Sequence, residues 1–151
     1  MSTDTADRII VSCPKCYTAN RVPSARTAEE PKCGKCHSPI FDPKPVELDE
    51  SSFDAFVGRD QLPVLVDFWA PWCAPCRAMA PAFEKTAGEL RTRARFVKVN
   101  TEDAQGLGAR YGIRAIPTLI VFVGGREAER VSGALDARSI AQLAMRHVKS
   151  P

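Results

Sequence analysis

The six cysteines of the chain fall into three pairs of the form Cys-x-x-Cys. The pairs are Cys13 with Cys16, Cys33 with Cys36, and Cys73 with Cys76. Two thiols at this spacing can bind one metal ion together, or they can alternate between a dithiol and a disulfide. The spacing indicates metal binding, redox chemistry or both, and the residues around each pair decide between them.

The first two pairs have the pattern of a structural zinc site. They read Cys-Pro-Lys-Cys and Cys-Gly-Lys-Cys with sixteen residues between them, an interval typical of sites in which four thiolates surround one Zn²⁺ ion. Four protein ligands leave no open coordination position. We therefore expect one structural zinc ion per chain, held by Cys13, Cys16, Cys33 and Cys36. Disulfides or a redox sensor are the alternatives. His37 could replace one ligand, but we expect a loop histidine.

Residues 8–41 contain few large apolar side chains. A segment of this size and composition cannot offset its chain entropy by hydrophobic burial alone, so metal binding would supply the missing folding free energy. Three prolines in residues 39–45 indicate a semi-rigid linker. We expect a zinc-binding module at residues 1–41, a linker at 42–45 and a second domain at 46–151.

From residue 46 onward, the apolar periodicity predicts alternating strands and helices. Strands are expected at residues 46–48, 62–69, 95–100, 118–123 and 127–131, and helices at 51–56, at 103–111, after Cys73 and after Asp136. Gly124 and Gly125 are expected to join the last two strands as a hairpin. This order predicts an α/β fold with a mixed central sheet flanked by helices.

The third pair, Cys73 and Cys76, follows the apolar strand 62–69 and opens the next helix. Unpaired backbone N–H groups and the positive end of the helix dipole favour a thiolate at such a position. Cys73 is placed at the exposed end of the helix and is the predicted nucleophile. Cys76, one turn further on, is the predicted resolving thiol. Pro75 is tolerated between them because first-turn N–H groups have no partner within the helix.

Two segments resemble thioredoxins. The segment Trp69-Ala70-Pro71-Trp72-Cys73-Ala74-Pro75-Cys76-Arg77, followed by Pro81, is similar to the thioredoxin active-site segment. Residues 112–119, Gly-Ile-Arg-Ala-Ile-Pro-Thr-Leu, resemble the thioredoxin segment whose proline is cis. With the preceding cysteine pairs, the whole chain is similar to the zinc-bearing bacterial branch of the family, the thioredoxin-2 type. Ala74 is a departure, because thioredoxins usually have glycine at this position, which helps to set the redox potential.

The resemblance implies a thioredoxin fold and a protein-disulfide reductase. Cys73 would attack a disulfide in a client protein, and Cys76 would then release the reduced client. The resulting Cys73–Cys76 disulfide would be reduced by a flavin-containing thioredoxin reductase fed by NADPH. The chain has no Gly-x-Gly-x-x-Gly segment with which to bind a dinucleotide itself.

Asp67 stands within the apolar strand 62–69, where an unpaired charge would be costly. Burial raises the pKa of a carboxyl group and would allow it to accept the proton of Cys76. A purely structural carboxylate is the alternative. The resemblance places the family's buried aspartate at this position and Lys98 near it, although the local sequence of Lys98 fits an ordinary edge lysine equally well.

Residues on three segments are candidates for contact with a client protein. They are Trp72, Ala74, Pro75, Ile116, Pro117 and Gly133. Trp72 is expected to form an apolar lip around the thiolate, whereas Trp69 is expected in the core. The resemblance implies a cis bond at Pro117, which would leave the backbone of Ile116 free to pair with an extended client segment. Gly133 would leave flat space for a partner to approach.

The composition excludes several classes of function. The chain has 151 residues and a net charge of 21 − 18 = +3, which is too small a basic excess for binding to nucleic-acid phosphates. No stretch approaches the about 18 apolar residues of a membrane span. The polar, acidic N-terminus has no signal-peptide pattern. We expect a cytoplasmic monomer without a membrane or nucleic-acid partner.

Two other functions stay open at this point. In the first, the chain is a zinc-dependent binding module whose thioredoxin fold is only a scaffold, and it would show no turnover. In the second, oxidants eject zinc from the first four cysteines and so alter the catalytic domain. The second function is compatible with reductase activity.

Overall fold

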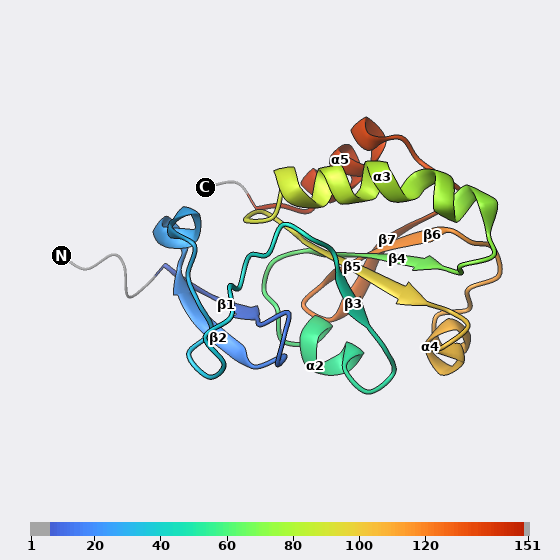
Figure 1. The fold of residues 1–151 in the computed structure, drawn as a ribbon. Helices are drawn as coiled ribbons and strands as arrows, with labels where there is room; N and C mark the ends of the chain where they lie inside the picture. Colours follow the sequence, from blue (N-terminus) through green and yellow to red (C-terminus); the bar gives the residue numbers. More distant parts are fainter. Residues whose placement is uncertain (1–6, 150–151) are drawn as a thin grey trace.

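A computed structural model describes residues 7–149 and contains a five-stranded sheet with a smaller two-stranded sheet beside it (Figure 1). The elements in chain order are β1 (Arg8–Ser12), β2 (Ala19–Pro23), the 3₁₀ helix η1 (Ser24–Glu29), β3 (Val46–Leu48), α2 (Phe53–Val57), β4 (Val64–Trp69), α3 (Ala74–Glu89), β5 (Arg95–Asn100), α4 (Gln105–Arg110), β6 (Thr118–Val123), β7 (Arg126–Ser132) and α5 (Ala137–Met145).

The large sheet has the strand order β3-β5-β4-β6-β7. β3 and β4 run parallel to β5, whereas β6 runs antiparallel to β4 and to β7. The predicted mixed sheet is therefore confirmed. Helices α3 and α5 cover one face, and the shorter α2 and α4 lie on the other (Figure 1).

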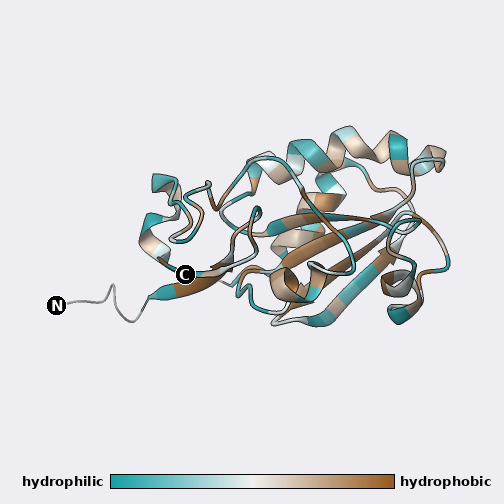
Figure 2. Ribbon diagram, turned by 60° about the horizontal axis from the view of Figure 1, so that its bottom comes forward, coloured by the Kyte–Doolittle hydropathy of each residue, from teal (hydrophilic) through white to brown (hydrophobic). Residues whose placement is uncertain are grey.

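Each face of the sheet carries its own apolar core, because successive side chains of a strand point to opposite faces. Val64, Val66 and Phe68 of β4 are buried in the cluster that includes residues of α2 and α4. Leu65 is buried in the cluster that includes residues of α3 and α5. Figure 2 shows the apolar residues concentrated on these central strands. Asp67 has the same parity as Leu65 and therefore faces the side of α3.

The smaller sheet is an antiparallel pairing of β1 with β2. It packs on a compact apolar cluster that consists of Val11, Cys13, Val22, Cys33, Ile40 and Phe41. The chain then passes through residues 42–45 along the C-terminal part of α3, where the carbonyl oxygen of Pro43 lies 3.8 Å from the position that a Cβ on Gly88 would occupy.

The predicted elements of the large sheet differ from the observed ones mainly at their ends. The strand predicted from residue 62 begins at Val64, directly after Pro63, which has no N–H to donate. The helix predicted from residue 51 begins at Phe53, because Asp49 Oδ1 accepts the N–H groups of Ser51 and Ser52 and holds them in a turn.

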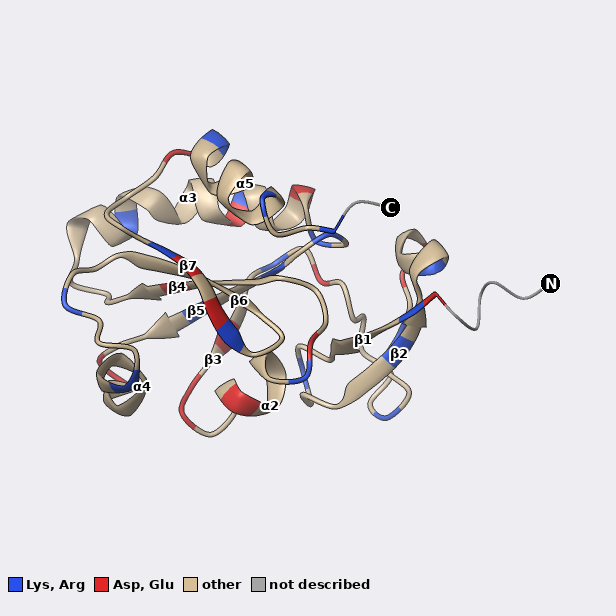
Figure 3. Ribbon diagram, turned by 180° about the vertical axis from the view of Figure 1, so that it is seen from behind, with Lys and Arg blue, Asp and Glu red and all other residues tan. Residues whose placement is uncertain are grey.

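β7 forms one edge of the sheet, and α5 packs on one of its faces. Gly124 and Gly125 have φ values of 60° and 80°, as the predicted glycine turn requires. The helix predicted after Asp136 is α5, and Asp136 caps it by accepting the N–H of Ser139. Lys/Arg and Asp/Glu residues are interspersed along the exposed strand β7 (Figure 3), which discourages pairing with another sheet edge. Among the helices of residues 7–149, none is long and apolar enough to cross a bilayer.

Candidate functional site

The Cys73–Cys76 pair is positioned by the junction between β4 and α3. Cys73 is the N-cap residue of α3, and its Sγ accepts the backbone N–H of Cys76 at 3.2 Å. Pro75 lies in the first turn, where its missing N–H leaves no helical bond unmade. The helix therefore begins with a free N–H group, that of Cys76, directed at the sulfur of Cys73.

Both thiols are largely covered by neighbouring residues. Cys73 is 5% exposed and Cys76 is 2% exposed, in a cluster with Ala70, Trp69 and Ile116. The prediction that Cys73 lies at the exposed end of the helix is wrong in this respect, because the side chains around the site close over it. Both cysteines are free thiols. Burial raises the pKa of Cys76 to about 12, and the adjacent Cys73 adds to the increase.

The second wall of the site comes from the segment before β6. The Ile116–Pro117 peptide bond is cis, and the Cys73 thiol donates to the Ile116 carbonyl oxygen at 3.7 Å. The N–H of Gly133, which follows β7, donates to the carbonyl of Pro117 at 2.8 Å. A Cβ at Gly133 would meet nothing within 4 Å. The structure thus brings Cys73, Ile116, Pro117 and Gly133 together at one place.

Asp67 of β4 is buried and only 1% exposed. Its Oδ1 atom has no hydrogen-bond partner among the described residues 7–149. Burial raises the pKa of Asp67 to about 7, and the positive charge of Lys98 partly opposes that increase. The charge of Asp67 in turn helps to raise the pKa of Cys76.

Lys98 stands opposite Asp67 in the register of β4 with β5. Its ammonium group lies 4.4 Å from the centroid of the Trp69 ring, a distance suited to a cation–π contact. Within residues 7–149 no ion pair joins Lys98 to Asp67. The positive charge of Lys98 therefore acts on the Asp67 carboxylate without a direct ion pair. Trp69 is half-buried and packs against Ala70, Cys73 and Cys76.

An open groove of about 490 Å³ lies beside the cysteines. Trp72, which is 64% exposed, forms one side, and Ile116 connects the groove to the sulfur of Cys73. Ala74 and Pro75 are exposed nearby on the first turn of α3. The remaining wall comes from the end of β5, from α4 and from the loop after it: Thr101, Gln105, Gly108, Ala109, Gly112, Ile113 and Arg114.

The residues of this wall, apart from the segment 112–116, were not predicted from the sequence. They carry no motif and reach the groove only because α4 packs on the face of the sheet opposite α3. The weak helical periodicity of residues 103–111 was the one available signal. The observed helix is shorter, Gln105–Arg110.

The remaining four cysteines form a second site. The Sγ atoms of Cys13, Cys16, Cys33 and Cys36 all lie within 4.8 Å of one another. The closest approaches are 3.5 Å between Cys13 and Cys36 and 3.6 Å between Cys16 and Cys33. Thiolates at the corners of a tetrahedron around Zn²⁺ would be about 3.8 Å apart. The four sulfurs therefore fit a tetrahedral metal ion, and His37 is not among the grouped ligands.

The two cysteine turns have the same backbone geometry. In the first turn, the backbone N–H of Tyr17 donates to the carbonyl of Cys13 at 2.9 Å. In the second, the backbone N–H of His37 donates to the carbonyl of Cys33, also at 2.9 Å. Tyr17 and His37 have φ values of 65° and 66°. Backbone N–H groups also point at the sulfurs, and that of Cys36 lowers the pKa of Cys33 to about 6. Such donors stabilise metal-bound thiolates.

Comparison with known proteins agrees with this architecture. The sequence profile of the family Thioredoxin matches residues 44–146, and the profile described as Thioredoxin 2, N-terminal, matches residues 12–38. The chain belongs to the thioredoxin family. It has a thioredoxin fold preceded by a zinc-ribbon-like module, and it is a dithiol–disulfide oxidoreductase that reduces protein disulfides.

Relatives of known sequence include Thioredoxin C-3 of Corynebacterium nephridii. It is 40% identical over 134 residues, which are 89% of this chain and 92% of the relative. Thioredoxin 1 of Nostoc sp. is 40% identical over 68% of this chain and 95% of its own. Among solved structures, a mutant thioredoxin from Halobacterium salinarum NRC-1 superimposes with a TM-score of 0.66 at 28% identity, covering 72% of this chain and 95% of that one.

Asp67→Asn should stabilise this thioredoxin increasingly as the pH rises. Folding raises the pKa of Asp67 from 3.8 to about 7, so the folded state binds the proton more tightly and loses stability as the pH rises between these values. Asparagine does not ionise, so the variant avoids this loss. Its free energy of unfolding relative to the wild type should rise by up to about 4 kcal/mol above pH 7. Urea unfolding of both proteins at pH 4 and pH 8 measures it. A stability difference that is the same at both pH values would contradict the raised pKa.

The four-cysteine site should hold one metal ion per chain, as measured by plasma mass spectrometry. Cys33→Ser should lose the ion, because it removes one of the four thiolates that lie within 4.8 Å of one another. Cys73→Ser is the matched control and should keep it. A metal-free wild-type protein, or equal loss in both variants, would contradict the assignment.

Proposed function

We propose that Cys73 is the attacking thiol and Cys76 the resolving thiol of this reductase. The observation that carries the proposal is the sulfur of Cys73, which lies at the N-terminus of α3 and 3.7 Å from the Ile116 carbonyl. The Cys73 thiolate attacks one sulfur of a client disulfide and forms a mixed disulfide. The other client sulfur leaves as a thiolate and takes up a proton.

Cys76 completes the exchange. Its thiolate attacks Cys73 Sγ, forms the Cys73–Cys76 disulfide and releases the second client thiol, so that two electrons pass from the dithiol to the client. Because burial raises the pKa of Cys76 to about 12, the thiol needs a base. Asp67, whose pKa burial raises to about 7, is the proposed base, acting through water. Lys98 tunes this base from β5.

The client is proposed to bind along the rim formed by Trp72, Ala74, Pro75, Ile116, Pro117 and Gly133. The exposed ring of Trp72 supplies apolar contact beside the groove. An extended client segment would pair with the backbone next to Pro117 as an added strand. The open space at Gly133 supports this binding mode, because a side chain there would meet the approaching client.

Membership in the family implies disulfide-containing clients and a reductase partner. We propose a flavin-containing thioredoxin reductase as that partner, the cytoplasm as the site of action and a monomer as the working form. The metal of the four-cysteine site is proposed to be Zn²⁺ in a structural role, since four thiolates satisfy its tetrahedral preference and leave no position for substrate.

The proposal is tested by insulin reduction coupled to thioredoxin reductase and NADPH. The wild-type chain should turn over continuously, and Cys73→Ser should reduce the rate to background because no attacking sulfur remains. Replacing the reductase by dithiothreitol separates a mismatched reductase from an inactive chain. A wild-type chain that is inactive with both reductants would be a binding scaffold, and the proposal would fail.

A further inference from the structure

Asp60 and Arg95 form a buried ion pair that the disulfide chemistry does not use. Arg95 Nη1 lies 2.6 Å from Asp60 Oδ2, and the two side chains are 4% and 0% exposed. Arg95 begins β5, and Asp60 lies just before β4. The pair therefore lies at the amino ends of two central strands, whereas Cys73 follows the carboxyl end of β4.

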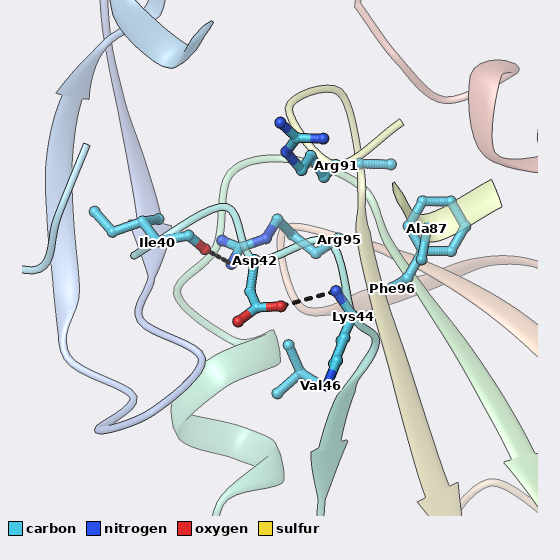
Figure 4. Close-up of a pocket in the computed structure, with 9 residues that line it drawn as sticks. Ile40, Asp42, Lys44, Val46, Ala87, Arg91, Arg95 and Phe96 are labelled. Carbon is cyan, nitrogen blue, oxygen red and sulfur yellow. Dashed lines mark hydrogen bonds between the residues drawn. The ribbon is translucent and has the colours of Figure 1, made fainter. Parts of the chain in front are cut away.

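Leu62 donates its backbone N–H to Asp60 Oδ1 at 3.0 Å, and the N-terminal region supplies two further hydrogen bonds to this pair. The carbonyl of Ile40 accepts from Arg95 Nη2 at 2.8 Å (Figure 4), and the N–H of Ser12 donates to Asp60 Oδ2 at 2.9 Å. A buried ion pair is stable only when its remaining donors and acceptors are satisfied. Ser12 and Ile40 both belong to the part of the chain that carries the four clustered cysteines.

Aromatic rings from both parts of the chain enclose the guanidinium group. The carbon Cζ of Arg95 lies 5.4 Å from the ring centroid of Phe41 and 5.0 Å from that of Phe56. The hydroxyl of Ser12 donates to the carbonyl of Phe56 at 2.7 Å. The cavity beside Arg95 has a volume of only about 10 Å³, close to the minimum for one water molecule.

A second set of contacts extends this interface along β1. Gln61 donates its N–H to the carbonyl of Ile10, and its side-chain oxygen accepts the N–H of Ile10; both bonds are 2.8 Å long. Leu62 packs against the apolar cluster of the N-terminal region, and Tyr17 packs against the core beside α2. The regions predicted as separate modules on either side of a linker thus share one packed interface.

The interface is also tied to the clustered cysteines. Ser12 immediately precedes Cys13, and Cys13 and Cys33 are buried in the same small cluster as Ile40 and Phe41. So small a core depends on its metal for folding. Loss of the metal would therefore release the groups that complete the buried ion pair, and an incompletely satisfied buried pair destabilises the surrounding structure.

We infer that the Asp60–Arg95 pair, completed by Ser12 and Ile40, is a clasp that makes the metal-binding region and the thioredoxin region one cooperative folding unit, so that metal binding stabilises the redox region. The inference rests on the proposed metal site. Its consequence is that the metal at one end of the sheet sets the stability of the strands that carry the redox cysteines at the other end.

The full-length chain offers a separate signal for each region. Its two tryptophans are Trp69 and Trp72, so tryptophan fluorescence reports the redox region. Co²⁺ bound by four thiolates absorbs visible light and reports the metal-binding region. In urea, both signals should change in one transition. Removal of the metal by a chelator should lower the fluorescence midpoint by about 1 M urea or more, the scale for loss of a tightly bound ligand.

The double variant Asp60→Asn/Arg95→Met tests the clasp without leaving a buried charge unpaired. It should bind Co²⁺, but the metal-dependent shift of its fluorescence midpoint should fall to less than half the wild-type shift. Asp54→Asn/Arg110→Met is the matched control, because it removes an exposed 2.7 Å ion pair within the thioredoxin region. This control should keep the full shift. If the first variant fails to fold, Arg95→Lys, which keeps a positive charge beside Asp60 but lacks the Nη2 group that donates to Ile40, should give an intermediate shift.

The outcomes separate the clasp from the metal site. Absence of Co²⁺ absorption in the wild-type chain would overturn the metal site and this inference together. Co²⁺ absorption with a fluorescence midpoint that does not depend on metal would overturn the inference alone. A full wild-type shift in Asp60→Asn/Arg95→Met, or in Arg95→Lys where that variant replaces it, would show that the coupling does not run through the clasp.

Discussion

The hydrogen bond from the Cys76 N–H to Cys73 Sγ is the contact on which the redox site depends. It exists because α3 begins at Ala74, which makes Cys73 the capping residue and directs the otherwise unpaired N–H of Cys76 at its sulfur. β4 fixes that starting point, since its buried side chains anchor the strand on both faces of the sheet. A thiolate formed on Cys73 would thus have a backbone N–H donor already in place.

Burial also shifts the pKa values of the second thiol, Cys76, and of the carboxyl group of Asp67. Asp67 and Cys76 are both withdrawn from water on the α3 side of the sheet, and burial raises the pKa of each. The charge of Asp67 adds to the increase in the pKa of Cys76. Lys98 moderates this balance from above the Trp69 ring without forming an ion pair with Asp67. Burial therefore has two results: a covered thiol at Cys76 and a carboxyl group at Asp67 whose pKa is raised to about 7.

Local sequence patterns correctly predicted those features that depend mainly on neighbouring residues. The strands at 95–100 and 118–123 were predicted at their observed bounds, because short segments rich in apolar, β-branched and aromatic residues favour strands. The cysteine spacing likewise predicted the four-sulfur cluster. The clasp could not be found this way. Asp60 and Arg95 are 35 residues apart and look like surface charges. Tertiary packing buries the pair, with the rings of Phe41 and Phe56 against the guanidinium group.

The most direct test is to trap the mixed disulfide with insulin and locate it by mass spectrometry of Cys76→Ser and Cys73→Ser. A stable adduct through Cys73 is expected in Cys76→Ser, because the attacking sulfur is present and the resolving one is gone. Cys73→Ser should form none. An adduct that accumulates through Cys76 instead, or equally in both variants, would contradict the assignment of Cys73 as the sulfur that α3 prepares for attack.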